Sequence, residues 1–191
     1  MAEAGVQGTA AQAAGPATGH WGEAQVELLK DWRQRSAAAS ESHYRLATVL
    51  RRKNLSLGVP AAVFAAIVGT SLFATLQETS QISNTFRVVI GSVSVLAAIL
   101  AGLQTFLRFG ERAEKHVVAA DWYAAIRRDI DEVVALPASA RGEPRDALDR
   151  VRKEMSKVGQ QSPEIPSSLW ERVARRYHVP LGPLGAPIPP P

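Results

Sequence analysis

Residues 88–107, VVIGSVSVLAAILAGLQTFL, decide the fold of this chain, because these 20 positions contain no charged side chain. A second uncharged stretch of 24 positions, residues 54–77, reads NLSLGVPAAVFAAIVGTSLFATLQ. A bilayer core about 30 Å thick needs roughly 20 residues of helix, so either stretch is long enough to cross it. Neither stretch shows the polar face that a helix of a soluble hairpin keeps. The pattern therefore predicts a hairpin of two transmembrane helices, about 55–77 and 88–107.

The cations that flank the two stretches predict their orientation. Five Lys or Arg residues lie in the 20 positions before Leu55 and four in the 20 positions after Leu107, whereas the connecting stretch 78–87 contains only Arg87. Cytosolic segments of membrane proteins carry an excess of Lys and Arg. We therefore expect both termini in the cytosol and the short loop on the other side of the membrane.

The rest of the chain predicts a cytosolic helical bundle, into which the helices of the hairpin extend. Apolar and small residues at a spacing of three to four predict a helix over 23–53, and the stretch 54–60, which ends in a proline, is expected to interrupt it. No proline occurs within 88–136, so the second span is expected to continue without a break as the cytosolic helix 108–136. That helix carries a stripe expected to pack against helix 23–53: Phe109, Ala113, His116, Ala120, Tyr123, Arg127, Ile130 and Val134.

Two shorter helices are expected after this stripe. One covers about 145–158, with Gly159 as its stop, and the other covers about 168–177, opened by a capping box of Ser168 and Glu171. An Ala- and Gly-rich N-terminus and a Pro-rich C-terminus predict disordered or flexible ends. The expected division of the chain is residues 1–20, a folded domain over 21–178, and a tail over 179–191.

The composition argues against an enzyme. The chain has no cysteine, and its four histidines lack the spacing of a local zinc motif. The glycines inside the spans are isolated from one another, so the sequence contains no Gly-rich phosphate loop. The two spans carry no charged residue, so they offer little to bind or transport a substrate. We expect no catalytic residue, no metal and no cofactor.

Nucleic acid is not an expected partner either. The formal charge of +4 suits an anionic membrane surface as well as a nucleic acid. Trp32, Trp122 and Tyr123 are interpreted as core anchors of the cytosolic helices rather than as platforms for stacked bases. Arg172, Arg175 and Arg176 form an exposed basic turn or contact phosphates of a lipid or nucleotide.

Small and weakly polar residues inside the spans are candidates for helix packing or for lining a pore. These candidates are Gly69, Thr70, Gly91, Ser94, Ala98, Gly102 and Gln104. Small residues let helices approach closely in lipid, so the faces Gly58–Ala62–Ala66–Gly69 and Gly91–Ser94–Ala98–Gly102 pack either within one hairpin or at a subunit interface. Gln104, with Thr70 as a candidate partner, either joins the two helices or contributes one polar group to a ring around an aqueous path.

His43 and His116 are candidates for packing between the cytosolic helices, together with Phe109 and Tyr123. His43 lies twelve residues before Leu55 and His116 nine residues after Leu107, so the two imidazoles are expected to face each other at a similar depth. They form either a structural hydrogen-bonded pair or a pH sensor.

Three stretches together resemble the SLATT domain family: NLSLGVPAAVFAAIVGTSLF, VLAAILAGLQTFLRFGERAEKHVVAADWYAAIRRDID and SPEIPSSLWERVARRYHVP. The most specific part is the second span running into Phe106, Glu111, Arg112, Ala113 and His116. The family consists of bacterial two-helix membrane effectors associated with nucleotide-signalled conflict systems. The resemblance, which covers roughly residues 21–178, implies an inner-membrane protein with a cytosolic helical part.

Two functions follow from this resemblance and from the spans. The first is a homo-oligomeric effector that perturbs or permeabilises the inner membrane in antiviral defence or inter-bacterial conflict. The second is a passive anchor that presents cytosolic helices to a partner protein. Residues 1–191 are not expected to include a sensor domain, so the resemblance implies a separate nucleotide-signalling or sensor protein as a further partner, besides the lipid bilayer.

Overall fold

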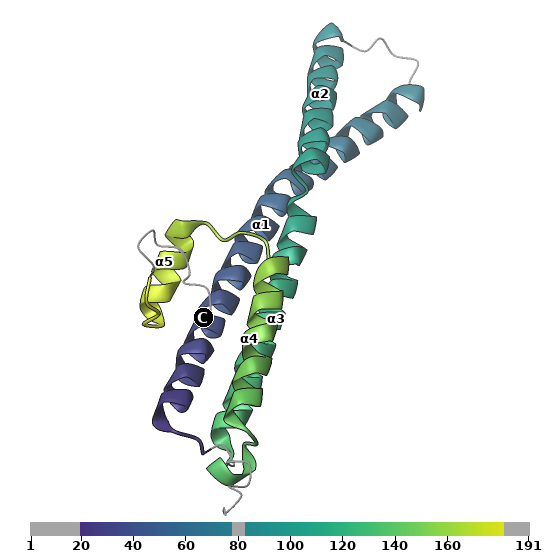
Figure 1. The fold of residues 1–191 in the computed structure, drawn as a ribbon. Helices are drawn as coiled ribbons and strands as arrows, with labels where there is room; N and C mark the ends of the chain where they lie inside the picture. Colours follow the sequence, from purple (N-terminus) through teal and green to yellow (C-terminus); the bar gives the residue numbers. More distant parts are fainter. Residues whose placement is uncertain (1–19, 78–82, 182–191) are drawn as a thin grey trace, which may run out of the picture.

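The computed structural model describes residues 20–77 and 83–181, of which 87% are helical and none forms a strand. Helix α1 (Glu23–Gln77) runs the length of the elongated molecule, α2 (Asn84–Leu107) returns beside its second half, and α3 (Phe109–Ala135) continues along its first half (Figure 1). The short η1 (Ala138–Ala140), α4 (Pro144–Gln161) and α5 (Ser167–Arg176) complete the fold. The all-α prediction is confirmed. The N-terminus expected to be disordered, up to residue 19, and the tail after residue 181 lie outside the described residues.

Helix α1 passes through Pro60 without a break, so the expected interruption over 54–60 is wrong. A proline inside a helix removes one backbone hydrogen bond, here to the Ser56 carbonyl, but its fixed φ is itself helical. Most of the stability of a helix in a protein comes from packing. Because α2 and α3 pack along α1 on both sides of this position, the helix persists despite the missing bond.

The second expectation that the structure overturns is the uninterrupted helix over 88–136. Arg108 has φ 46° and ψ 39°, in the left-handed region, and separates α2 from α3. Its N–H still donates to the Gln104 carbonyl, and its own carbonyl accepts from the Arg112 N–H. The left-handed residue at a helix end is usually Gly or Asn, so no sequence signal marks this break. The break at Arg108 lets α3 lie along the first half of α1 while α2 runs at a different angle. Figure 1 shows the α2–α3 path crossing α1 near this break.

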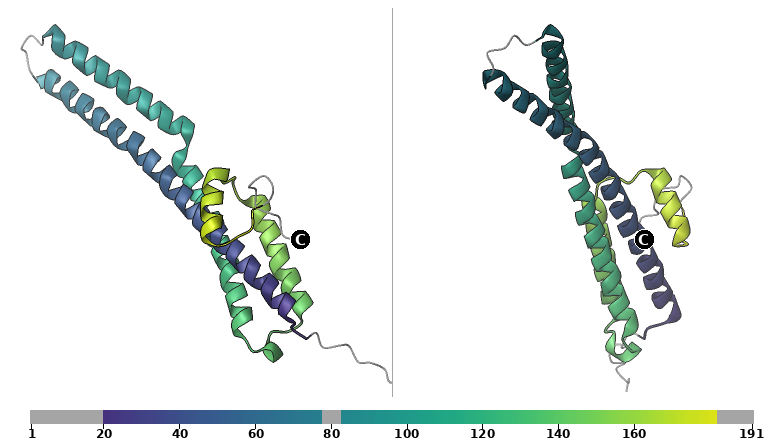
Figure 2. Two further views of the ribbon diagram at one scale, coloured as in Figure 1. Left: turned by 90° about the vertical axis from the view of Figure 1, so that its left-hand side faces the viewer. Right: turned by 180° about the vertical axis from the view of Figure 1, so that it is seen from behind.

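A hydrophobic core joins α1, α3 and α4, which lie together at one end of the molecule (Figure 2). Leu29 and Trp32 of α1 meet Ile126 and Ile130 of α3. The remaining buried members are Trp21, Val133, Ala147, Val151, Met155 and Val158. The α1–α3 pair is further joined by the Ser40 hydroxyl, which donates to the Ala120 carbonyl at 3.0 Å, and by an ion pair between Arg33 and Asp131. We call this packed region, residues 21–53 and 109–181, the bundle.

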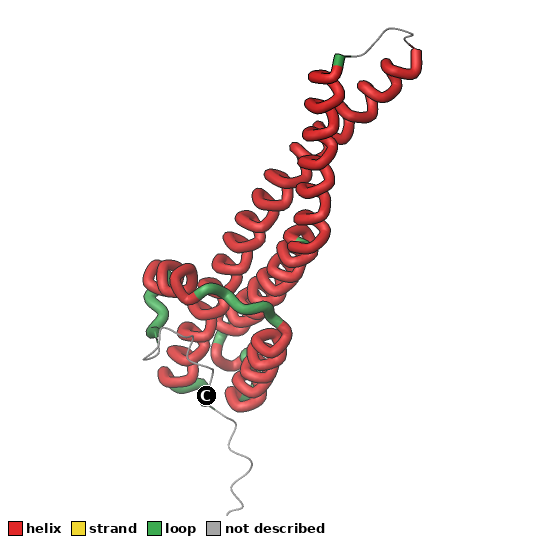
Figure 3. Tube along the Cα trace, turned by 90° about the horizontal axis from the view of Figure 1, so that it is seen from above, coloured by secondary structure: helices red, strands yellow, loops and turns green. Residues whose placement is uncertain are grey.

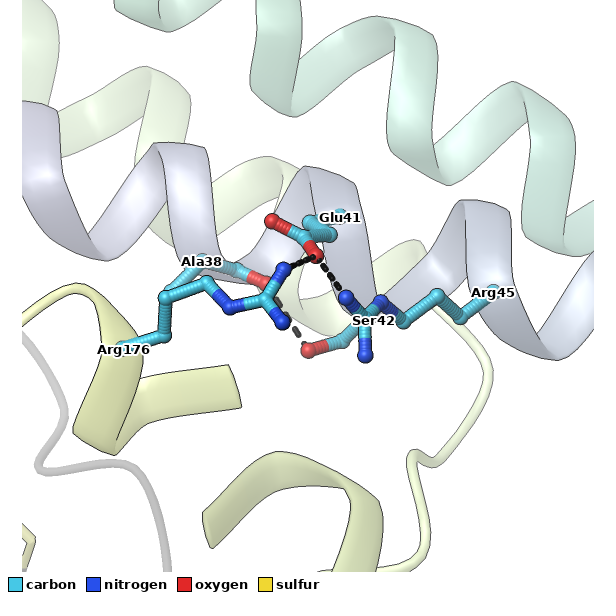
Figure 4. Close-up of polar contacts among 5 residues, drawn as sticks. All are labelled: Ala38, Glu41, Ser42, Arg45 and Arg176. Carbon is cyan, nitrogen blue, oxygen red and sulfur yellow. Dashed lines mark hydrogen bonds and ion pairs between the residues drawn. The ribbon is translucent and has the colours of Figure 1, made fainter. Parts of the chain in front are cut away.

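Helix α5 packs on another side of α1 from α4 (Figure 3), and Tyr123 of α3 packs against the same contact. Ala38 and Ala39 of α1 leave room there for Trp170, Val173 and Ala174 of α5. Figure 4 shows the polar part of this contact, in which the Glu41 carboxylate lies between the guanidinium groups of Arg45 and Arg176. Of the basic turn expected near the C-terminus, Arg176 is therefore engaged within the chain.

Glu41 also accepts a hydrogen bond from the Tyr177 side chain. Desolvation by itself raises the pKa of the Glu41 carboxyl, but the Tyr177 hydrogen bond and the charges of Arg45 and Arg176 outweigh it, so the pKa lies below its ordinary value. The carboxylate consequently stays charged at neutral pH and holds the end of α5 against α1.

The expected stripe on α3 faces α1 and the bundle core in most of its positions. Ala113, His116, Ala120 and Ile130 are buried, Phe109, Tyr123 and Val134 are half-buried, and Arg127 is exposed. Trp122, expected to be a core anchor, is instead 40% exposed, whereas Trp32 is 2% exposed. Trp122 is adjacent to Tyr123 in the sequence, but successive residues are about 100° apart around a helix. Trp122 therefore lies outside the stripe that includes Tyr123.

The two short helices differ from the expectation at their ends. Helix α4 continues through Gly159 to Gln161, so the expected stop at this glycine is wrong; a Cβ atom there would lie 3.7 Å from the Tyr123 hydroxyl. Helix α5 begins at Ser167 after Pro166, with no side-chain cap, so the expected capping box does not form. A proline before the first turn already fixes a backbone that suits a helix start.

Candidate functional site

The candidate site is the apolar hairpin formed by the second half of α1 and by α2. Two helical segments, one in α1 and one in the α2–α3 pair, are long and apolar enough to cross a membrane. In the most apolar 18 residues of each segment, only 6% and 0% are buried against the rest of the described structure. The core helix of a soluble protein would be mostly buried, so these two segments differ from such a helix in their burial.

One face of α2 carries small residues that are largely uncovered by the residues that the structure describes. A Cβ atom added to Gly91 or Gly102 would find no other atom within 4 Å. Ala98 is exposed, and Ser94 is half-buried with its hydroxyl bonded to the Ile90 carbonyl of its own helix at 2.9 Å. Three of the four residues expected to pack closely are thus exposed, so most of this face is not covered by the part of the hairpin that the structure describes. We call Gly91, Ser94, Ala98 and Gly102 the open face of α2.

The two helices of the hairpin approach closely at Gly58 and Gln104. A Cβ atom at Gly58 would lie 2.8 Å from Gln104 Nε2 and 3.2 Å from Gln104 Oε1, which is too short for any larger residue without movement. A larger residue at position 58 would therefore require the amide end of the Gln104 side chain to move. Gln104 serves here as an intramolecular contact between the helices.

Thr70 is not the partner of Gln104 that the sequence suggested. It lies about three turns beyond Gly58 along α1, and its hydroxyl donates to the carbonyl oxygens of Ala66 and Ile67 in its own helix, each at 3.0 Å. Gly69, next to it, meets no atom within 4 Å. The α1 residue buried near the close approach is Ala61, and Ala62, assigned to the small-residue face, is exposed.

Below the hairpin, His43 and His116 come into contact inside the bundle. The two Nδ1 atoms are 2.9 Å apart, and the side chains are 1% and 5% exposed. Tyr123 stacks on His43 with ring centroids 5.7 Å apart and planes 14° from parallel. One Nδ1 must donate and the other accept, so the contact cannot persist when both rings are protonated, because two N–H groups would then face each other.

Burial makes this pair reluctant to take up protons. Desolvation, with a smaller contribution from His116, lowers the pKa of His43 to about 4. Desolvation, with a smaller contribution from the nearby Arg112 charge, lowers the pKa of His116. Both imidazoles are therefore neutral at physiological pH, which favours a structural hydrogen-bonded pair.

Acid is expected to destabilise the bundle through this pair. An unfolded histidine has a pKa near 6.5, so below that pH the unfolded state binds more protons than the folded state. The stabilisation is complete above pH 6.5 and is lost as the pH falls toward about 4, by roughly 2 kcal/mol for His43 after allowance for screening. Melting temperatures of the detergent-solubilised protein, followed by circular dichroism between about pH 7.5 and 4.5, measure this loss.

The matched variants are His43→Gln and His20→Gln, since His20 is exposed and outside the pair. The first variant is expected to flatten the pH dependence and the second to retain it. An equal slope in the wild type and in His43→Gln contradicts the assignment.

Some residues of this region were not found by sequence reasoning. Arg108 carries the break between α2 and α3, and nothing in its identity marks it. The Ser40–Ala120 hydrogen bond depends on the register of two helices distant in sequence. Among residues 20–77 and 83–181, no three His, Asp or Glu side chains come together as a metal site.

The fold and the candidate site define a helical bundle that carries an apolar two-helix hairpin. Comparison with protein-family models, curated protein sequences and solved structures found no match to this chain. The resemblance to the SLATT domain therefore depends on the quoted sequence stretches alone.

Proposed function

We propose that this chain is a membrane effector that assembles with copies of itself and permeabilises a bacterial inner membrane. The observation that carries the proposal is the open face of α2, where a Cβ atom added to Gly91 or Gly102 would meet none of the described residues outside its own helix turn. Small residues on a lipid-facing helix allow a neighbouring backbone to approach, which is how helices associate where water supplies no driving force. A second copy of α2 fits this face.

The membrane location is supported by the exposure of the hairpin. Soluble monomers rarely expose contiguous apolar patches as large as two unburied helices of this length, and a bilayer covers such faces. The excess of cations at the bundle end of the hairpin favours an orientation with the bundle and both termini in the cytosol. In this arrangement the loop between α1 and α2 lies outside the inner membrane.

The biological setting that we propose is defence against phage or conflict between bacteria, as implied by the resemblance to the SLATT domain. The chain is then the membrane-acting component, and a separate nucleotide-signalling or sensor protein controls it. The bundle is the part of the molecule that such a protein can reach from the cytosol. No catalytic role and no cofactor is proposed.

A passive anchor is the second candidate function, and one surface of the bundle favours it. Val118 and Trp122, one turn apart on α3, are both 40% exposed. An exposed tryptophan next to a valine is typical of a contact surface for another protein. In this case the hairpin only holds the bundle at the membrane.

Ion flux from liposomes distinguishes the two functions. The purified full-length protein is reconstituted into liposomes loaded with a self-quenching dye and with potassium, and release of each is followed against empty liposomes. A pore is expected to release potassium at a rate that rises more steeply than linearly with protein density, because several copies form each path. Liposomes that contain assembled protein but release nothing contradict the permeabilising function and leave the anchor.

A further inference from the structure

Cations surround the level at which the hairpin meets the bundle. Three lie on α1 and three at the start of α3: Arg51, Arg52, Lys53, Arg108, Arg112 and Lys115. The structure places the two groups at the same level, because Lys53 Nζ lies 5.8 Å from the Phe109 ring centroid and a Cβ atom at Gly110 would lie 3.7 Å from Asn54 Nδ2. We call these six residues the basic collar. In Figure 1 it lies where α2 gives way to α3 beside α1.

The collar is exposed and only partly neutralised. All six side chains belong to exposed residues. Arg108 and Lys115 share one carboxylate, that of Glu111, at 3.3 and 3.1 Å. Arg51, Arg52 and Arg112 form no ion pair with any residue that the structure describes. Three free guanidinium groups therefore point outward within one or two turns of the apolar hairpin.

The break at Arg108 contributes to this arrangement. The first turn of a helix has N–H groups without partners inside the helix, and α3 begins here with no side-chain cap. The positive end of α3 thus adds to the positive charge of the collar. Glu111 and Glu114 are the acidic residues within 51–53 and 108–115, two carboxylates against six cations.

We propose that the basic collar binds the phosphates of anionic phospholipids, so that the protein gathers phosphatidylglycerol-type lipids around its hairpin. This inference rests on the proposed function, since it requires the hairpin to lie in a bilayer. Each Lys or Arg close to an anionic lipid surface strengthens attraction severalfold, and guanidinium groups bind phosphate oxygens in a bidentate manner. A lipid headgroup fits better than a nucleic acid, because the cations lie on two neighbouring helices at the level where the apolar segment begins.

The test compares three forms of the full-length protein in detergent. Native mass spectrometry follows the binding of phosphatidylglycerol and of phosphatidylcholine to each form. The first variant combines Arg51→Gln, Arg52→Gln and Arg112→Gln. The matched control removes three equally exposed cations on α4, combining Arg145→Gln, Arg150→Gln and Lys153→Gln. Circular dichroism of all three forms verifies that the helices are intact.

The wild type and the α4 control are expected to bind phosphatidylglycerol at least tenfold more tightly than phosphatidylcholine, and the collar variant to lose most of this preference. Raised salt should weaken the preference, because it screens exposed charges. Inorganic phosphate should not displace the lipid at equal concentration. Equal affinity for the two lipids, an unchanged preference in the collar variant, or displacement by inorganic phosphate overturns the inference.

Failure of the inference is distinguishable from failure of the proposed function. Extraction of membranes with alkaline carbonate reports whether the wild-type protein is embedded. Release by carbonate contradicts the membrane location and both proposals with it. Retention together with equal affinity for the two lipids contradicts the collar alone.

Discussion

Trp32→Ala is expected to destabilise the bundle by roughly 3–5 kcal/mol, whereas Trp122→Ala should cost less than about 1 kcal/mol. Trp32 is 2% exposed and belongs to the core formed by α1, α3 and α4, so its removal leaves a cavity the size of an indole ring. Trp122 is 40% exposed, so a large part of its surface already faces outward. The two tryptophans therefore form a matched pair with the same chemical change at two depths.

Thermal unfolding of the full-length protein in one detergent, followed by near-ultraviolet circular dichroism, measures both variants. Trp32→Ala should lower the melting temperature by many degrees or leave the bundle open to protease, while the hairpin stays in the membrane fraction. Comparable losses in the two variants would show that Trp122 is buried and that the packing of α3 differs from the one described.

Gly102→Leu is expected to abolish both oligomers and ion flux, the largest functional effect that the structure predicts. A Cβ atom at Gly102 would meet none of the described residues outside its own helix turn within 4 Å, so a leucine there fits the isolated hairpin and interferes only with a neighbouring copy. Ala98→Leu, on the same open face, should act in the same direction. Because helices associate in lipid through close packing, added bulk at this face should reduce flux at least tenfold.

Gly58→Leu is the intramolecular counterpart of this change. A Cβ atom at Gly58 would lie 2.8 Å from Gln104 Nε2, so a leucine there must displace the Gln104 side chain and adds bulk between α1 and α2 within one chain. It should lower the yield and stability of the monomer, whereas Gly102→Leu should leave them unchanged. Cross-linking in liposomes measures assembly, and potassium release measures function. Gly102→Leu protein that cross-links and conducts like the wild type would rule out the open face of α2 as the assembly surface.

The sequence predicted the long-range contact between the histidines because depth along two helices can be counted from a common reference. His43 and His116 stand at similar distances from the two apolar stretches, and the structure joins their Nδ1 atoms at 2.9 Å. The same counting placed the α3 stripe against α1. What these predictions share is periodicity, which a helix imposes on every residue in the same way.

The predictions that failed concern breaks and contacts that periodicity does not encode. Pro60 favoured an interruption in α1, yet packing on both sides keeps that helix whole. The identity of Arg108 did not indicate a left-handed backbone, since the change of direction is imposed by where α2 and α3 must lie. The pairing of Gln104 with Gly58 instead of Thr70 depends on the crossing of two helices, and a one-residue shift in register decides which small residue is covered.

The contrast between an unbroken α1 and a divided α2–α3 path has a mechanical consequence. A twist or tilt applied to the bundle end of α1 is carried to its far end by one continuous helix, which lacks a single backbone hydrogen bond at Pro60, whereas the return path changes direction at Arg108. Helix α1 thus moves as one rigid element, and α2 moves beside it about a hinge at Arg108. Helix α5 is joined to α1 by the Arg176–Glu41 ion pair. A partner that binds α5 would therefore move α1 and change the angle of α2 without unfolding either helix.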